Sequence, residues 1–203
     1  MPTRNRVIIS IVAVGLLSLA SLASADTTPI PGPYNENSCK ANIDGVALQG
    51  DADDDTIDGT PLNDLLKGGG GDDTIDGDLG DDCLFGEDGK DTLDGSAGDD
   101  FIVGGNQADR ARGRDGKDTI KGGGDEDRLK GGNGADKIRG GQGDDRLNGQ
   151  AGDDTISGQS GNDSIRDLAD KNTIRCGKGK DKVVTNKESK VASDCETIRR
   201  VTT

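Results

Sequence analysis

Aspartate recurs every nine residues through the middle of the chain, and its carboxylate is the group there with the clearest chemistry. The series runs without insertion or deletion, and one further aspartate follows in the same register. Its members are Asp55, Asp64, Asp73, Asp82, Asp91, Asp100, Asp109, Asp118, Asp127, Asp136, Asp145, Asp154, Asp163 and Asp181. Carboxylate and carbonyl oxygens are the ligands that hard divalent cations such as calcium take, six to eight at a time. One nine-residue turn supplies too few, so two stacked turns must share an ion.

Other chemistries fit the residue types less well. The chain has no His and only four Cys at irregular spacing, which argues against a zinc or copper site. An EF-hand needs a twelve-residue loop, whereas the period here is nine. Two carboxylates could form a glycosidase pair, but aspartates that share the period of the turn are better explained as cation ligands. We therefore predict that the protein is not an enzyme.

Glycine marks the start of each nine-residue unit, at every ninth position from Gly50 to Gly158. A second glycine usually stands at the fourth position, and it is replaced by Asp53, Leu62, Gln107 and Asp125. Glycine permits a positive φ and close approach of the backbone to an ion, so we expect both at positions one and four. We expect weaker sites near Leu62 and Gln107, in the second and seventh units.

An aliphatic residue stands two positions after each aspartate, from Ile57 to Ile165, with Ala111 as the one small member. The last three residues of each unit therefore alternate as a short strand does, with one side chain on the inner face. Six residues of turn and three of strand cannot bury a core alone. Stacked copies can pair strand on strand, as in other repeat proteins.

Segments such as GGGGDDTID (68–76), GEDGKDTLD (86–94) and GGNGADKIR (131–139) resemble the repeats-in-toxin (RTX), or haemolysin-type, calcium-binding nonapeptide. The resemblance covers Gly50 to Arg166 and, more weakly, 167–184. It implies an all-β fold, a right-handed parallel β-roll (a β-solenoid) of about seven two-strand coils with short terminal caps. Two nonapeptides would make one coil, and several Ca²⁺ ions would lie between turns one coil apart.

The resemblance also implies two columns of aspartates, one along each edge of the roll. The first edge would hold Asp55, Asp73, Asp91, Asp109, Asp127, Asp145, Asp163 and Asp181. The second would hold Asp64, Asp82, Asp100, Asp118, Asp136 and Asp154, and Asn172 would end it with a doubtful last site. The core would be one aliphatic side chain wide from each sheet. Folding should therefore depend on calcium, which removes the repulsion between stacked carboxylates.

The composition agrees with a cation-dependent fold. The chain has 34 Gly, 29% hydrophobic residues and a net charge of −14, values that suggest disorder when the cation is absent. The same negative charge excludes nucleic acid as a partner.

The N-terminus reads as a targeting segment. Arg4 and Arg6 precede an apolar run from Val7 to Leu22, and Ala23-Ser24-Ala25 is a cleavage motif. We predict a signal peptide over 1–25, in preference to a membrane anchor, and thus a secreted, extracellular protein without a membrane span. Residues 26–49 would form a linker and N-terminal cap, 50–184 the roll and 185–203 a C-terminal cap.

Four cysteines in a secreted chain suggest two disulfides, with three possible connectivities. Cys176 and Cys195 flank the C-terminal cap and are the easiest pair, which leaves Cys39 with Cys83. Cys83 would lie within an outward apolar patch of Leu65, Phe85, Phe101 and Val103. Such a patch marks an interface, and we expect the N-terminal cap to cover it. The alternatives are a patch that binds nothing or one that dimerises the protein.

Two non-enzymatic functions follow from these features. The first is a secreted calcium-binding protein whose roll folds around its ions. The second is a calcium-dependent adhesin or glycan- or cell-wall-binding module that uses an outer sheet face. An unbroken threonine column would favour the second function, but the column Thr56, Thr74, Thr92 breaks at Arg110. The first function is therefore preferred, and a cell-surface or glycan partner stays open.

Overall fold

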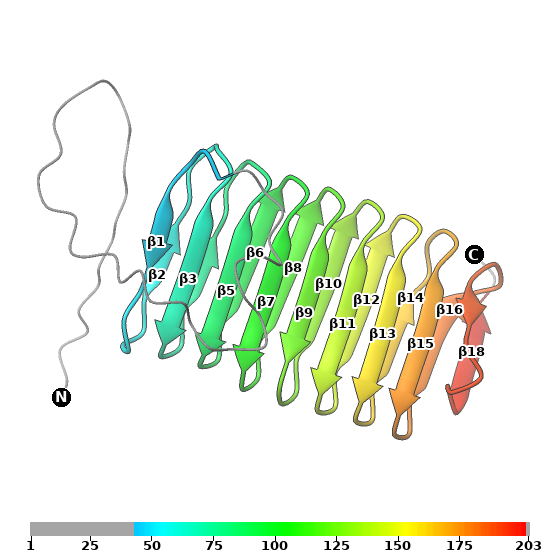
Figure 1. Cartoon of the computed structure of the whole chain (residues 1–203). Helices are drawn as coiled ribbons and strands as arrows, with labels where there is room; N and C mark the ends of the chain where they lie inside the picture. The colour runs from blue at the N-terminus through cyan, green and yellow to red at the C-terminus, as the bar shows by residue number, and fades with distance from the viewer. Residues whose placement is uncertain (1–42, 202–203) are drawn as a thin grey trace, which may run out of the picture.

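The computed structural model describes residues 43–201, in which all regular structure is β-strand (Figure 1). Strands alternate between two nine-stranded sheets along the chain. The first sheet contains β2 (Thr56–Asp58), β4 (Thr74–Asp76), β6 (Thr92–Ala97), β8 (Arg110–Asp115), β10 (Arg128–Asn133), β12 (Arg146–Ala151), β14 (Ser164–Asp167), β16 (Lys182–Asn186) and β18 (Thr197–Val201). The second contains β1 (Ala47–Gln49), β3 (Leu65–Gly70), β5 (Cys83–Asp88), β7 (Phe101–Asn106), β9 (Thr119–Gly123), β11 (Lys137–Gln142), β13 (Thr155–Ser160), β15 (Thr173–Lys178) and β17 (Lys190–Val191).

Neighbouring strands in each sheet are parallel and, through the array, come from units 18 residues apart. Ile138 in β11, for example, pairs with Ile120 in β9 and with Ile156 in β13. Two nine-residue units therefore make one coil, and the coils stack along one axis (Figure 1). This confirms the predicted all-β, parallel β-solenoid.

The solenoid has about nine turns, slightly more than the seven expected, because both ends add strands outside the nine-residue pattern. At the N-terminal end β1 pairs with β3. At the C-terminal end β17 pairs with β15 and β18 pairs with β16. Strands β17 and β18 lack the nine-residue spacing, so the spacing does not predict them as part of a coil. They extend both sheets beyond residue 184.

The core is a double column with one aliphatic side chain from each strand of the array. Because side chains alternate along a strand, the residue between two outward-pointing neighbours points into the core. The parallel register then places this residue next to the equivalent residue of the neighbouring coil. The first sheet contributes Ile57, Ile75, Leu93, Ala111, Leu129, Leu147, Ile165 and Val183, and the second contributes Leu66, Leu84, Ile102, Ile120, Ile138, Ile156 and Ile174. All are buried, including the small Ala111.

The apolar patch on the outer face of the second sheet is covered, not exposed. Phe85 is 6% exposed and Val103 is 3% exposed, and with Cys83 they form a cluster against which Leu65 and Phe101 pack. Outward side chains further along this sheet, such as Lys137, are exposed. Cys83 is disulfide-bonded. The predicted partner Cys39 and the predicted N-terminal cover lie outside the described residues.

The predicted signal peptide, 1–25, and most of the predicted linker and N-terminal cap also fall outside the described residues. Within residues 43–201, no helix is long and apolar enough to cross a membrane. At the other end, Cys176 and Cys195 form the predicted disulfide, with Cα atoms 5.1 Å apart. This bond fastens the last turn of the array to the segment that leads into β18.

Candidate metal centre

The structure stacks the aspartates of the nine-residue units into two columns, one along each edge of the roll. Each aspartate lies immediately before the first residue of a strand, as Asp118 does before β9. Because strand neighbours are 18 residues apart, like positions recur on the same edge, with the members that the resemblance implied. All fourteen predicted aspartates lie at these edges, and each is at most 9% exposed.

In thirteen of the fourteen aspartates, from Asp64 to Asp181, one carboxylate oxygen accepts an amide of the preceding coil. The amide of Asp100 donates to Oδ1 of Asp118 at 2.9 Å, and the amide of Asp109 donates to Oδ1 of Asp127 at 2.8 Å. The same bond repeats along both columns. Each of these carboxylates is therefore fixed in orientation before any ion binds.

The other oxygen, Oδ2, is buried without a hydrogen-bond partner in twelve of the fourteen. They are Asp73, Asp82, Asp91, Asp100, Asp109, Asp118, Asp127, Asp136, Asp145, Asp154, Asp163 and Asp181. A buried carboxylate oxygen without a donor is costly and requires a compensating group. Asp55 and Asp64 differ, because their Oδ2 atoms accept from the amides of Asp51, at 2.9 Å, and Thr60, at 2.5 Å.

The glycine that starts each unit leaves room beside this free oxygen. A Cβ added at Gly122 would overlap Oδ2 of Asp127 and would lie 2.6 Å from the carbonyl oxygen of Gly140, in the next coil. The space that a side chain would fill is thus bounded by carboxylate and carbonyl oxygens. This donor set fits calcium, which takes oxygen ligands of both kinds.

The expectation about glycine backbone angles was wrong for position one. None of the glycines from Gly50 to Gly158 at that position has a left-handed φ. They are glycine because a Cβ would collide with the carboxylate and carbonyl oxygens. Left-handed angles occur at position four, as at Gly116, and also at position two, where Ser96 and Arg114 adopt φ of 70° and 81°. Gln107 keeps a left-handed φ of 71° at position four, so that turn retains its shape.

Burial makes the free carboxylates hard to ionise. Desolvation is the largest cause, and neighbouring carboxylates add to it, whereas the hydrogen bond from the backbone opposes it. Together they raise the pKa to about 8 for Asp109, Asp118 and Asp145, to about 7 for Asp82, Asp100 and Asp127, and to about 6 for Asp73, Asp91, Asp136 and Asp163. A bound divalent cation would remove this penalty, because it favours the charged form.

Several supporting acids were not predicted from the sequence. At position five, Asp81 and Asp99 accept backbone amides of the following coil through Oδ1, both at 2.8 Å. The recurrent Asp-Asp pair in the sequence could have indicated them, but the prediction assigned a role to its second residue alone. At the C-terminal end, Glu196 accepts the amide of Asp181 at 2.8 Å and so replaces the next aspartate of the first edge.

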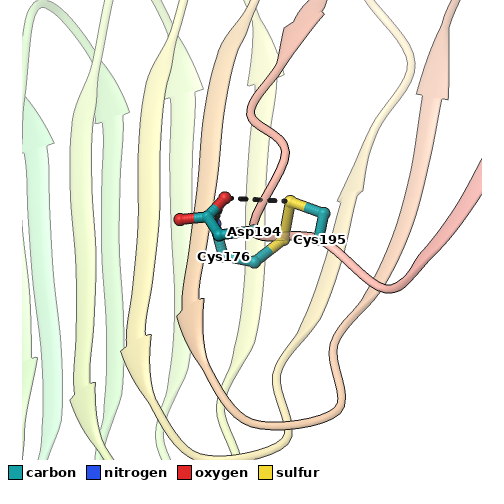
Figure 2. A group of neighbouring side chains, drawn as sticks. All are labelled: Cys176, Asp194 and Cys195. Carbon is teal, nitrogen blue, oxygen red and sulfur yellow. Dashed lines mark hydrogen bonds between the residues drawn. A yellow bond between two sulfur atoms is a disulfide. The ribbon is translucent and has the colours of Figure 1, made fainter.

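The cluster of Cys176, Asp194 and Cys195 has the residue types of a metal site but not the chemistry (Figure 2). Both sulfurs are bonded to each other in the disulfide, so neither can act as a thiolate ligand. The Asp194 carboxylate instead accepts the amides of Cys176, at 3.3 Å, and Gly177, at 3.2 Å. These contacts join the segment before β18 to β15.

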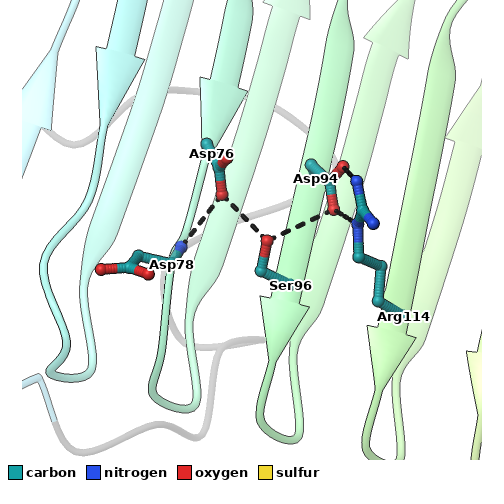
Figure 3. Close-up of polar contacts among 5 residues, drawn as sticks. All are labelled: Asp76, Asp78, Asp94, Ser96 and Arg114. Atoms are coloured by element: carbon teal, nitrogen blue, oxygen red, sulfur yellow. Dashed lines mark hydrogen bonds and ion pairs between the residues drawn. The ribbon is translucent and has the colours of Figure 1, made fainter.

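The outer face of the first sheet changes from acidic to basic near its middle. Asp76 accepts hydrogen bonds from the hydroxyl of Ser96 and the amide of Asp78, at 3.0 and 3.1 Å (Figure 3). Arg114 forms a two-pronged ion pair with Asp94, and this pairing raises the pKa of the Arg114 guanidinium. The ion pair links β6 to β8 at the point where the outward acids give way to arginines.

Comparison with known families identifies the array. The profile described as RTX calcium-binding nonapeptide repeat (4 copies) matches residues 49–83, 58–93, 84–111, 103–137, 112–147, 130–165 and 148–183. No curated protein matches the chain. The matched segments cover most of the chain and coincide with the coils that carry the two aspartate columns. The chain therefore belongs to the RTX calcium-binding nonapeptide repeat family.

Proposed function

We propose that this chain is a secreted calcium-binding protein whose β-roll folds around Ca²⁺ held between stacked turns. The observation that carries the proposal is the set of twelve buried Oδ2 atoms without a hydrogen-bond donor, seven on the first edge and five on the second. Repeats of this family bind calcium, and a column of such oxygens beside an oxygen-lined space is suited to several ions.

The residues of one central turn would act together. Oδ1 of Asp127 is held by the amide of Asp109, so its Oδ2 faces the space beside Gly122. The carbonyl of Gly140 approaches the same space from the next coil. Bound calcium would supply the positive charge that this set of oxygens lacks. The ion would link two successive coils, because its ligands belong to both.

The thin core supports a coupling between binding and folding. Each strand of the array contributes one inward side chain, so little apolar area holds one coil to the next. The carboxylates stack along each edge at the spacing of the strands, and their repulsion opposes folding when they are ionised. Binding free energy would then appear as folding free energy, as in other small metal-dependent domains.

A calcium titration followed by far-UV circular dichroism tests this proposal. We expect the metal-free chain at pH 8 to lack β structure and to gain it in millimolar calcium, a range known for extracellular calcium modules. Equilibrium dialysis would count the ions bound. A β spectrum that chelator leaves unchanged, together with no bound calcium, would contradict the proposal. Magnesium serves as the control, because its octahedral preference fits such a site poorly.

We further propose secretion and a non-catalytic role. Residues 4–25 carry the charged, apolar and small-residue regions of a signal peptide. Expression in a cell with its own secretory pathway should give a mature N-terminus at Asp26, which N-terminal sequencing would read. An intact Met1 on the exported chain would contradict this assignment.

A second candidate function is calcium-dependent adhesion to an acidic glycan of a cell wall. Arg110, Arg128 and Arg146 are register partners on β8, β10 and β12, and all three are exposed. They line a cleft of about 480 Å³, although Asp125 and Glu126 also line it. Cell-wall pull-down with and without calcium tests this function. Binding that needs calcium and is lost in Arg128→Ala/Arg146→Ala would favour the adhesin.

A further inference from the structure

Asp167 stands where the nine-residue pattern calls for glycine. It follows Gly158 by one unit, at the end of β14, and was not among the predicted ligands. Its side chain is fully buried, and neither Oδ1 nor Oδ2 has a hydrogen-bond partner. Its polar neighbours are the Asp154 carboxylate, the Asn172 side chain and the backbone of Ala169, and two buried acids this close together call for a positive charge between them.

The carboxylate of Asp167 points into the oxygen-lined space of the coil before it. A Cβ added at Gly149 would overlap Oδ2 of Asp154 and also Oδ2 of Asp167. At most other units the second oxygen near this point is a backbone carbonyl. Beside Gly131 it is the carbonyl of Gly149, and beside Gly140 it is the carbonyl of Gly158. Asp167 therefore places a charged oxygen where other turns have a neutral one.

Asn172 explains why an extra charge is useful at this point. The amide of Asp154 donates to Oδ1 of Asn172 at 2.8 Å, so the hydrogen-bond ladder of the second edge is kept. The Nδ2 of Asn172 donates to the carbonyl of Ala169 at 2.7 Å, and the amide side chain has no anionic oxygen to offer. The last turn of this edge has thus lost a carboxylate at Asn172 and gained one at Asp167.

We propose that Asp154 and Asp167 together hold the last calcium ion of the second edge, with the Asp167 side chain in the place of a glycine carbonyl. This inference rests on the proposed calcium-binding function. It replaces the doubtful site expected at Asn172 with a defined one. Because calcium affinity rises with the number of charged ligands, this site is expected to be among the tighter ones on the edge.

Substitution of Asp167 tests the assignment. Asp167→Asn keeps the shape and removes the charge, and Asp167→Gly restores the residue of the pattern. Native mass spectrometry would count the ions per chain, and isothermal titration calorimetry would measure their affinities. We expect one ion to weaken in both variants by at least about tenfold, the lower end of the loss seen when a group that merely orients a metal ligand is removed.

A matched control and a rescue separate a ligand from a general effect of charge. Glu188→Gln removes one exposed negative charge from the same end of the roll and should leave every affinity unchanged. Asp167→Gly/Asn172→Asp rebuilds the ordinary pattern and should recover the weakened ion. If Asp167→Asn does not fold in calcium, Asp167→Gly carries the test alone.

The outcomes distinguish this inference from the function on which it rests. If the unchanged chain binds no calcium, the proposed function fails. If it binds calcium, and Asp167→Gly retains every ion at the original affinity, only the role of Asp167 fails. Weakening of one ion together with its recovery in the double variant supports the assignment.

Discussion

The first two nine-residue units of the array and the units that follow share one spacing of glycine and aspartate but differ in how their carboxylates are bonded. Here a turn means one such unit. In the central turns, residues 68–163, Oδ2 of each edge aspartate is buried without a donor. In the first two turns, residues 50–67, the amide of Asp51 or Thr60 donates to that oxygen. The first turns thus satisfy their carboxylates from within the chain, whereas the central turns leave Oδ2 without a donor.

The difference lies at position two of the unit. In the central turns this residue is left-handed, whether it is Gly105 or Ser96, and its amide is not bonded to Oδ2. Asp51 and Thr60 have no left-handed φ, and their amides face the carboxylate. A β-branched residue such as Thr60 strongly disfavours that region. The conformation at position two, and not the aspartate itself, therefore decides which carboxylates stay available.

Hydrogen exchange with and without calcium at pH 5.5, where the metal-free chain is expected to retain β structure, should separate the two regions by the largest margin. An ion stabilises the structure that binds it by about 2.7 kcal/mol when its free concentration is 100 times the dissociation constant. Central amides such as that of Asp118 should therefore exchange about 100-fold more slowly in calcium. Amides of the first two turns should gain less. An equal gain in both regions would remove the distinction.

Alanine at a first-position glycine should disturb a central turn severely. In Gly122→Ala the new Cβ overlaps Oδ2 of Asp127, so we expect a loss of about 1–3 kcal/mol, as for overpacked sites, and weaker calcium binding. Gly124→Ala is the matched control in the same turn, because its Cβ would meet nothing closer than 4.0 Å and its φ is not left-handed. Thermal unfolding in calcium checks both variants. Equal unfolding midpoints would show that the oxygen-lined space tolerates a methyl group.

In a central turn, replacing the edge aspartate by asparagine should lower the stability of the calcium-loaded chain but not that of the metal-free chain. Asp118→Asn keeps the Oδ1 acceptor for Asp100 and removes a buried charge. We expect the calcium-loaded chain to lose about 1–3 kcal/mol, the range for a lost hydrogen bond or ligand contact to a charged group, and the metal-free chain to lose nothing or to gain stability. Denaturant unfolding measures the loss in calcium, and far-UV circular dichroism in chelator at pH 5.5, where the metal-free chain is expected to retain β structure, measures the metal-free chain.

The first turns supply the control for that substitution. Asp64→Asn removes the charge of a carboxylate that already accepts hydrogen bonds from the amides of Thr60 and Val46. Its loss should change stability by a similar amount whether or not calcium is present. A calcium-dependent effect as large as that of Asp118→Asn would place an ion at Asp64 as well.

Metal-free folding should improve as the pH falls, since the folded chain keeps protons on its central carboxylates that the unfolded chain loses. The pKa of Asp118 is raised from 3.8 to about 8, and that of Asp127 to about 7. This contribution to stability is present in full below about pH 4 and is lost as the pH rises toward 8. Calcium-free circular dichroism should therefore show more β structure at pH 5.5 than at pH 8. The opposite trend would contradict the burial of unpaired carboxylates.

The sequence predicted the architecture because a strict nine-residue period with one aliphatic residue leaves few ways to bury a core. It predicted both aspartate columns through the family resemblance. It indicated strand-like residues around Cys195 but did not predict that β17 and β18 continue the two sheets, because their residues lack the period. Position two could not be interpreted, since Gly105, Ser96 and Arg114 share one left-handed conformation there without a common chemistry. Asp167 was missed because it occupies a glycine position.

The most specific test gives the second turn the residues of a central turn, although we expect it to have the smallest effect on calcium binding. Thr60→Gly/Leu62→Gly gives positions two and four the residue that adopts left-handed angles without strain. The amide at position 60 should then leave Oδ2 of Asp64, and that oxygen would become available for an ion. We expect one additional bound calcium by native mass spectrometry, at the affinity of a weak extracellular site, about 10⁻⁴–10⁻³ M.

Ser96→Gly is the control, because position 96 is already left-handed and Oδ2 of Asp100 is already free. Its ion count should not change. An unchanged count in Thr60→Gly/Leu62→Gly as well would show that something other than position two separates the first turns from the rest.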